Sequence, residues 1–95
     1  MNILTHIDDT FYKSTGNYAK VRFGKYSADR VRFDQSDSHL TELILNYYEC
    51  ELTEDEDIEM GIDIYSEDGT HLNMYDITSS EILQEMRNET NHIYN

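Results

Sequence analysis

The chain has 95 residues, of which 38% are hydrophobic, and a formal net charge of −13 at pH 7. This length predicts a single acidic domain over residues 1–95 with one core, and the apolar content argues against wholesale disorder. No run of about 20 apolar residues is present to span a membrane. The single cysteine, Cys50, leaves no disulfide framework and predicts a reducing, cytoplasmic location.

Apolar residues recur at helix or strand spacing in seven segments. In chain order these are a helix within residues 1–12, strands 17–24 and 29–34, a helix over 40–48, strands 57–65 and 70–77, and a helix from residue 79. The first segment is short and contains β-branched residues, so a strand remains the alternative there. The order (α)ββαββα predicts an α+β fold, a four-stranded antiparallel sheet built from two β-hairpins with two or three helices on one face.

The first hairpin alternates apolar side chains with basic ones, which is typical of a half-buried sheet. A turn at residues 26–28 sets Phe23 opposite Val31 and Arg22 opposite Arg32. Like charges that face each other directly destabilise a sheet. We therefore expect acidic groups beside this pair, either from a neighbouring strand or from a partner.

The helix over residues 40–48 carries the clearest amphipathic stripe of the chain. It is preceded by capping side chains at Ser36, Asp37 and Ser38. No glycine follows it. We attribute its end to the acidic run that begins at Glu49, because a helix C-terminus favours cations.

The second hairpin has an alternating apolar series on its first strand, at Ile58, Met60, Ile62 and Ile64. A three-residue loop, 67–69, provides a glycine where a left-handed backbone is needed. This loop sets Ile64 opposite Leu72 and Ile62 opposite Met74.

The last helix begins with the pattern of a capping box, in which Thr78 is the N-cap and Glu81 is the third helical residue. Ile77 and Ile82 are spaced to form a hydrophobic staple around it. We expect this helix to fray before its polar end, residues 88–95.

Charge is distributed unevenly along the chain. Residues 1–32 hold six of the seven basic residues, whereas residues 33–86 hold sixteen acids and no Lys or Arg. Half of the residues between Glu49 and Asp68 are acidic. We predict that these ten acids bind the partner: Glu49, Glu51, Glu54, Asp55, Glu56, Asp57, Glu59, Asp63, Glu67 and Asp68.

Two arrangements of these charges remain open. The acids are exposed on one continuous surface without basic partners, as a partner-binding surface requires, or the first hairpin neutralises them. In the second case the basic hairpin residues pair across the sheet with Asp57, Glu59 and Asp63. Those basic residues are Lys20, Arg22, Arg30 and Arg32.

No catalytic, metal or cofactor motif accompanies the acids. His6, His39, His71 and His92 are too far apart in sequence for a local metal motif, and His71 is expected opposite Tyr65 on the outer sheet face. The glycine spacing does not fit a calcium loop, and no glycine-rich phosphate loop is present. We therefore predict a protein that is not an enzyme and has no catalytic residues, metal or cofactor.

The charge favours a cationic protein as the partner, such as a nucleic-acid-binding enzyme or complex, because a net charge of −13 repels nucleic acid itself. Two classes of protein fit this description, because in both an acidic protein binds a cationic nucleic-acid-binding partner. They are phage-type anti-defence proteins that mimic DNA (anti-restriction or anti-CRISPR inhibitors) and immunity proteins of nuclease toxins. The alternative is a small non-enzymatic accessory or regulatory module, or a homodimer that uses its basic hairpin and acidic face.

Tyrosines are expected to supply uncharged contact area in such an interface. Strand positions place Tyr18, Tyr65 and Tyr75 toward solvent. Helix positions place Tyr47 and Tyr48 at least partly in the core.

Overall fold

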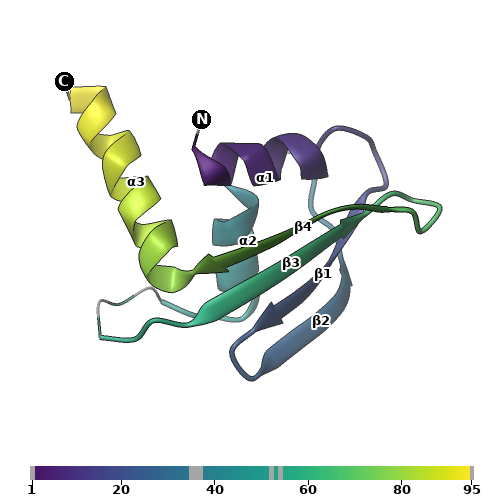
Figure 1. Ribbon diagram of the computed structural model, residues 1–95, viewed down its shortest axis with the longest axis horizontal. Coiled ribbons are helices and arrows are strands. Elements are labelled where there is room, and N and C mark those ends of the chain that lie inside the picture. Colours follow the sequence, from purple (N-terminus) through teal and green to yellow (C-terminus); the bar gives the residue numbers. More distant parts are fainter. Residues whose placement is uncertain (1, 35–37, 52, 54, 95) are drawn as a thin grey trace.

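The computed structural model describes residues 2–34, 38–51, 53 and 55–94 of the chain. The elements of this part are α1 (Ile3–Phe11), β1 (Tyr18–Phe23), β2 (Tyr26–Val31), α2 (Leu40–Tyr47), β3 (Glu59–Tyr65), β4 (His71–Thr78) and α3 (Ser79–Tyr94). The strands form one antiparallel sheet in the order β2-β1-β3-β4 (Figure 1). This confirms the predicted α+β fold, and the first segment is a helix rather than a strand.

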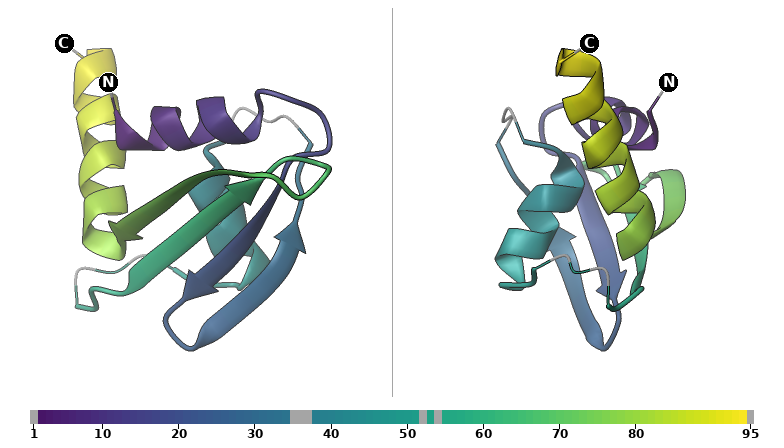
Figure 2. Two further views of the ribbon diagram at one scale, coloured as in Figure 1. Left: turned by 45° about the vertical axis from the view of Figure 1, so that its right-hand side comes forward. Right: turned by 90° about the vertical axis from the view of Figure 1, so that its left-hand side faces the viewer.

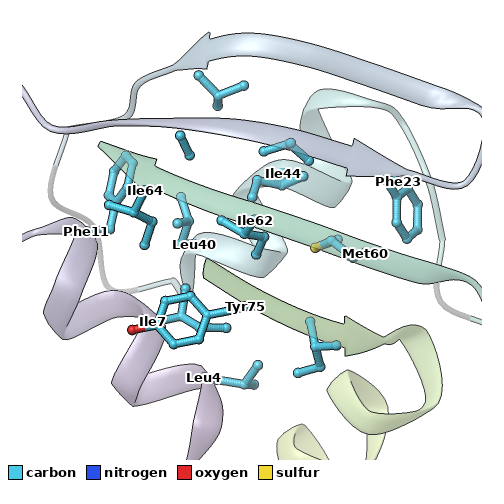
Figure 3. Close-up of a cluster of buried hydrophobic side chains, with 14 of the residues drawn as sticks. Leu4, Ile7, Phe11, Phe23, Leu40, Ile44, Met60, Ile62, Ile64 and Tyr75 are labelled. Atoms are coloured by element: carbon cyan, nitrogen blue, oxygen red, sulfur yellow. The ribbon is translucent and has the colours of Figure 1, made fainter. Parts of the chain in front are cut away.

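The core lies between one face of the sheet and the helices (Figures 2 and 3). The sheet contributes the buried side chains of Ala19, Val21, Phe23, Met60, Ile62, Ile64, Tyr75 and Ile77. Helices α1 and α2 pack on them through Leu4, Ile7, Phe11, Leu40 and Ile44. Helix α3 adds the fully buried Ile82, and its later turns extend past α1 and away from the sheet (Figure 1). The alternation predicted for β3 is therefore confirmed.

The β1–β2 hairpin turns earlier than predicted. Gly24 has a φ of 56° and begins a two-residue turn that places Phe23 opposite Tyr26. Glycine adopts this backbone without steric cost, so the chain reverses there. Arg22 consequently faces Ser27, and the prediction that two arginines face each other is wrong.

A register shift further along the same hairpin brings Val31 opposite Ala19 instead of its predicted partner. Arg30 lies within this shift and has a φ of 57°. The guanidinium groups of Arg30 and Arg32 lie over the Tyr18 ring, with their central carbons 5.3 and 5.7 Å from its centroid. The shift therefore gathers two arginines over one aromatic ring.

The loop between β3 and β4 forms as predicted. Tyr65 faces His71. The Ser66 amide donates to the Thr70 carbonyl at 2.9 Å, and the Gly69 amide donates to the Ser66 carbonyl at 2.9 Å. Gly69 has a φ of 91°, in the region that favours glycine.

A β-bulge directly after this loop changes the register of the rest of β4. Leu72 is the extra residue, so Ile62 faces Tyr75 rather than Met74, and Ile64 no longer faces Leu72. Leu72 and Met74 are 43% and 49% exposed, whereas Tyr75 is buried. The predicted pairings beyond the loop are therefore wrong by one residue.

Helix α2 obtains its N-terminal cap from another helix. The predicted capping residues Ser36 and Asp37 lie outside the described residues, and the N-cap residue is His39, whose side chain makes no capping hydrogen bond. Asp8 of α1 instead accepts a hydrogen bond from the Leu40 amide at 2.8 Å, and its other oxygen lies 2.6 Å from Nδ1 of His39. One carboxylate thus joins α1 to α2.

The capping box of α3 is confirmed. The Thr78 amide donates to the Glu81 carboxylate at 3.2 Å, and the Glu81 amide donates to Oγ1 of Thr78 at 3.2 Å. Ile77 and Ile82 on either side are buried, as a hydrophobic staple requires. The helix continues to Tyr94, through the polar stretch over which fraying is expected from the sequence.

Candidate protein-binding surface

The ten predicted binding residues lie in three parts of the fold. Residues 49–58, called the connector below, join α2 to β3 and contain Glu49, Glu51, Asp55, Glu56 and Asp57; Glu59 and Asp63 are on β3; Glu67 and Asp68 are in the β3–β4 loop. Glu54 lies outside the described residues. The described members are exposed except for Asp63, which is half-buried.

These acids do not form one continuous surface. The connector lies at one end of the β3–β4 hairpin and the loop lies at the other (Figure 1). The seven residues of β3 span roughly 20 Å between them, at about 3.4 Å per residue. A surface for one partner must therefore be sought at one end.

The last three residues of the connector, 56–58, are held in place by the first turn of α3. The buried hydroxyl of Ser79 accepts from the Ile58 amide at 2.8 Å and donates to the Glu56 carbonyl at 3.2 Å. Asp57 accepts from the Ser80 hydroxyl at 2.8 Å and from the Ser80 amide at 3.2 Å, and these hydrogen bonds lower the pKa of Asp57. Asp57 therefore helps to cap α3. Strand β3 begins at Glu59, two residues later than the predicted start at Asp57.

Two acids outside the predicted set join the connector end. Asp76 of β4 and Glu81 of α3 line an open cleft of about 290 Å³ together with Glu59 and Arg22. The exposed carboxylates gathered here, called the acidic end below, belong to Asp55, Glu56, Asp57, Glu59, Asp76 and Glu81. Asp76 lies between Tyr75 and Ile77, which face the core, so it faces outward. The sequence alone does not indicate this, because the bulge at Leu72 decides which residues of β4 face the core.

The basic hairpin does not close ion pairs with these acids. Lys20 is the cross-strand partner of Asp63, and Arg22 lies beside Gly61, yet no Lys or Arg of the hairpin comes within 4.0 Å of a described carboxylate. Nζ of Lys20 instead lies 5.2 Å from the centroid of the Tyr65 ring. The acidic end therefore matches the alternative of exposed acids in that no hairpin cation closes an ion pair with its described carboxylates, although Arg22 lines the same cleft as Glu59, Asp76 and Glu81.

The acids of the β3–β4 loop have structural partners. Asp68 accepts hydrogen bonds from the Ser66 hydroxyl and from the Thr70 amide, the latter at 3.0 Å. The Glu67 carboxylate packs against Gly16, where an added Cβ would lie 2.7 Å from its oxygen. The carboxylates of Glu67 and Asp68 therefore make contacts that maintain the conformation of this loop.

Acid should loosen this loop. The hydroxyls of Ser66 and Thr70, followed by the Thr70 amide, lower the pKa of Asp68 from 3.8 to about 2. A depressed pKa stabilises the fold above about pH 4, and this contribution is lost as the pH falls toward 2. We expect Asp68→Asn to be less stable than the parent chain at pH 7 and the difference to disappear by about pH 2. Urea titrations at several pH values measure this, and a difference independent of pH would contradict it.

Glu49 ends α2 in a strained conformation. Its φ is 55°, its amide donates to the Asn46 carbonyl at 3.0 Å, and the Cys50 amide donates to the Leu45 carbonyl at 2.9 Å. This is the Schellman pattern, which favours glycine at the position of Glu49. The end of α2 is therefore set by these hydrogen bonds as well as by the acidic charge that follows it.

Replacing Glu49 with glycine should stabilise the protein. A residue with a Cβ in the left-handed region costs roughly 1–2 kcal/mol. Glycine removes this cost, but it also makes the unfolded chain more flexible, which offsets part of the gain. We expect Glu49→Gly to raise the free energy of unfolding by about 0.5–1 kcal/mol, and Glu49→Ala to give no such gain. Chemical denaturation of both variants compares them, and equal effects would contradict the strain.

The histidines make separate local contacts. Nδ1 of His6 lies 2.8 Å from the Tyr75 hydroxyl, and Nε2 of His71 lies 2.9 Å from Asp63. No group of three His, Cys, Asp or Glu side chains among the described residues is arranged to hold a metal ion. The same part of the chain has no helix with the length and apolarity needed to cross a membrane.

Comparisons with protein families, with curated proteins and with solved structures find no match to this chain. The candidate surface therefore stands on its own geometry.

Proposed function

We propose that this chain is an acidic inhibitor that binds another protein and occupies the cationic surface with which that partner holds nucleic acid. The observation that carries this proposal is the acidic end, where six exposed carboxylates gather and no hairpin Lys or Arg lies within 4.0 Å of a described carboxylate. Duplex DNA presents one negative charge per about 1.7 Å of its axis, so a protein that binds DNA offers a matching row of cations.

Two carboxylates of the acidic end, those of Asp57 and Glu81, are held in place by hydrogen bonds at the start of α3. Ser79 holds residues 56–58 against α3 through Ile58 and Glu56. Carboxylates that are already ordered lose little entropy on binding, and their field speeds encounter with a cationic partner. The function belongs in the cytoplasm, in a phage-type anti-restriction or anti-CRISPR protein or in an immunity protein for a nuclease toxin.

A second candidate is an accessory module or homodimer that uses the basic hairpin. It is supported by the open outer face of the sheet, where Lys20 lies over Tyr65, and Arg30 and Arg32 lie over Tyr18. These cations are available to the acidic end of a second copy. Sedimentation at low and high salt separates the candidates, since a homodimer held by these charges dissociates in salt.

Charge reversal at the acidic end tests the leading proposal. We expect the chain to capture DNA-binding proteins from a bacterial lysate and to release them to salt and to competing duplex DNA. The double variant Asp55→Lys/Glu56→Lys should bind a captured protein roughly tenfold more weakly, since each exposed charge pair contributes about 0.2–1 kcal/mol.

The matched control is Asp9→Lys/Asp34→Lys, which changes the net charge equally at two exposed sites away from the connector. This control should bind nearly as well as the parent chain. Equal weakening by both variants, or recovery of no cationic protein, would contradict the proposed surface.

A further inference from the structure

Three tyrosines form a compact aromatic patch where the β1–β2 turn meets the end of α2. The rings of Tyr26 and Tyr48 are stacked, with centroids 5.2 Å apart and planes at 23°. Tyr47 meets Tyr48 edge-on at 5.1 Å and 86°. Tyr47 is 60% exposed and Tyr26 is 41% exposed, although Tyr47 was expected to lie partly in the core. The three residues are called the tyrosine patch below.

The prediction of which tyrosines face solvent is wrong for two others as well. Tyr18 and Tyr75 are buried, and Tyr65 is half-buried beneath Lys20. Aromatic area for an interface is therefore not spread over the sheet. Among the tyrosines whose side chains are described, it is concentrated in Tyr26 and Tyr47.

The surroundings of the tyrosine patch are acidic on one side. The exposed Glu49 and Glu51 lie one and three residues after Tyr48 in the chain, at the start of the connector that leads to the acidic end. Lys25 places its Nζ 5.6 Å from the Tyr26 centroid, so a ring of the patch already accepts a cation from its own chain. The patch thus offers aromatic faces together with carboxylates that follow them.

We infer that the tyrosine patch is the aromatic anchor of the interface proposed above and that it takes arginine side chains of the partner. This inference rests on the proposed function, since the partner must be cationic. A guanidinium group is planar, so it can stack flat on an aromatic ring while its N–H groups bind a carboxylate, whereas a lysine ammonium is not planar and cannot stack in this way. The Tyr26 ring stacks on Tyr48 and the Tyr47 ring meets Tyr48 edge-on, so both rings are already packed and lose less conformational entropy on binding.

Other occupants fit less well. Single-stranded nucleic acid also stacks on tyrosine, but it requires several cations along its backbone, whereas Lys25 is the one cation over a ring of the patch among the described residues, and the chain continues from Tyr48 into Glu49 and Glu51. A purely apolar partner would leave these two carboxylates without a counterpart at the edge of the interface.

The experiment compares decaarginine and decalysine peptides, which carry equal charge, in titrations with the full chain at low and moderate salt. Stacking at an exposed ring changes affinity by roughly two- to fivefold. We expect the parent chain to prefer decaarginine by about this factor and Tyr47→Ala to lose the preference. Tyr47→Phe should keep it, because the ring remains. Leu72→Ala, at a residue 43% exposed on β4, is the matched control and should also keep it.

The outcomes separate the two proposals. Equal, salt-dependent binding of both peptides by the parent chain would overturn the role of the tyrosine patch and leave the acidic end intact. A preference that survives Tyr47→Ala and a Tyr26→Ala/Tyr47→Ala variant would overturn it too. Binding of neither peptide would overturn both the patch and the proposed function.

Discussion

Replacing Ile77 with alanine is expected to lower the free energy of unfolding by about 2–5 kcal/mol, whereas Leu72→Ala is expected to cost less than about 1 kcal/mol. Ile77 is 2% exposed and faces the fully buried Met60 across the sheet. Leu72 is the extra residue of the bulge and is 43% exposed. Truncating Ile77 leaves a cavity in the core, whereas truncating Leu72 removes a side chain that is already partly in solvent and leaves no cavity.

Urea denaturation of the two variants measures this contrast, with Met74→Ala as a further exposed control. The register expected from sequence alone gives a different result, because it faces Leu72 and Met74 toward the core. A loss of several kcal/mol in Leu72→Ala, or little loss in Ile77→Ala, would therefore contradict the position of the bulge.

The bulge shows where sequence reasoning loses information. The β4 segment contains apolar residues in both phases of its alternation, Leu72 and Met74 in one and Tyr75 and Ile77 in the other. A period of two cannot choose between phases, and one extra residue exchanges them. The choice is made by distant contacts, such as the hydrogen bond between the Tyr75 hydroxyl and Thr10 of α1 at 2.6 Å.

Features that depend on neighbouring residues could be predicted. The capping box at Thr78 and Glu81, the left-handed Gly69 and the alternation of β3 each follow from a few adjacent positions. The position of the end of α2, just before Glu49, was also predicted, but the left-handed backbone of Glu49 was not, because hydrogen bonds hold a glutamate there against its own preference. Local chemistry therefore predicted the elements, and tertiary contacts decided how they are joined.

Some features of the candidate surface could likewise be predicted from the sequence, whereas others depend on the tertiary structure. The exposure of the connector acids follows from charge, because such residues are seldom buried. The addition of Asp76 and Glu81 requires the β4 register and the position of α3. The separation of Glu67 and Asp68 from the connector requires the length of β3, which turns one acidic stretch of sequence into two distant places.

Ser79→Ala is expected to lower the free energy of unfolding by about 1–3 kcal/mol, the cost of leaving a poorly hydrated polar group without its partner. The Ser79 side chain is buried and bonds both the Ile58 amide and the Glu56 carbonyl. Without it the connector loses two hydrogen bonds to α3. Hydrogen exchange at the Ile58 amide should accelerate even where the rest of the sheet stays protected.

The control is Ser80→Ala, one residue along the same helix, where an exposed hydroxyl donates to Asp57. We expect a smaller loss of stability there and no change at the Ile58 amide. Equal losses in the two variants would contradict the anchoring role of Ser79. Ser79→Ala also leaves the net charge unchanged, so weaker capture of a cationic partner by the folded variant would show that the carboxylates must be held in position as well as present.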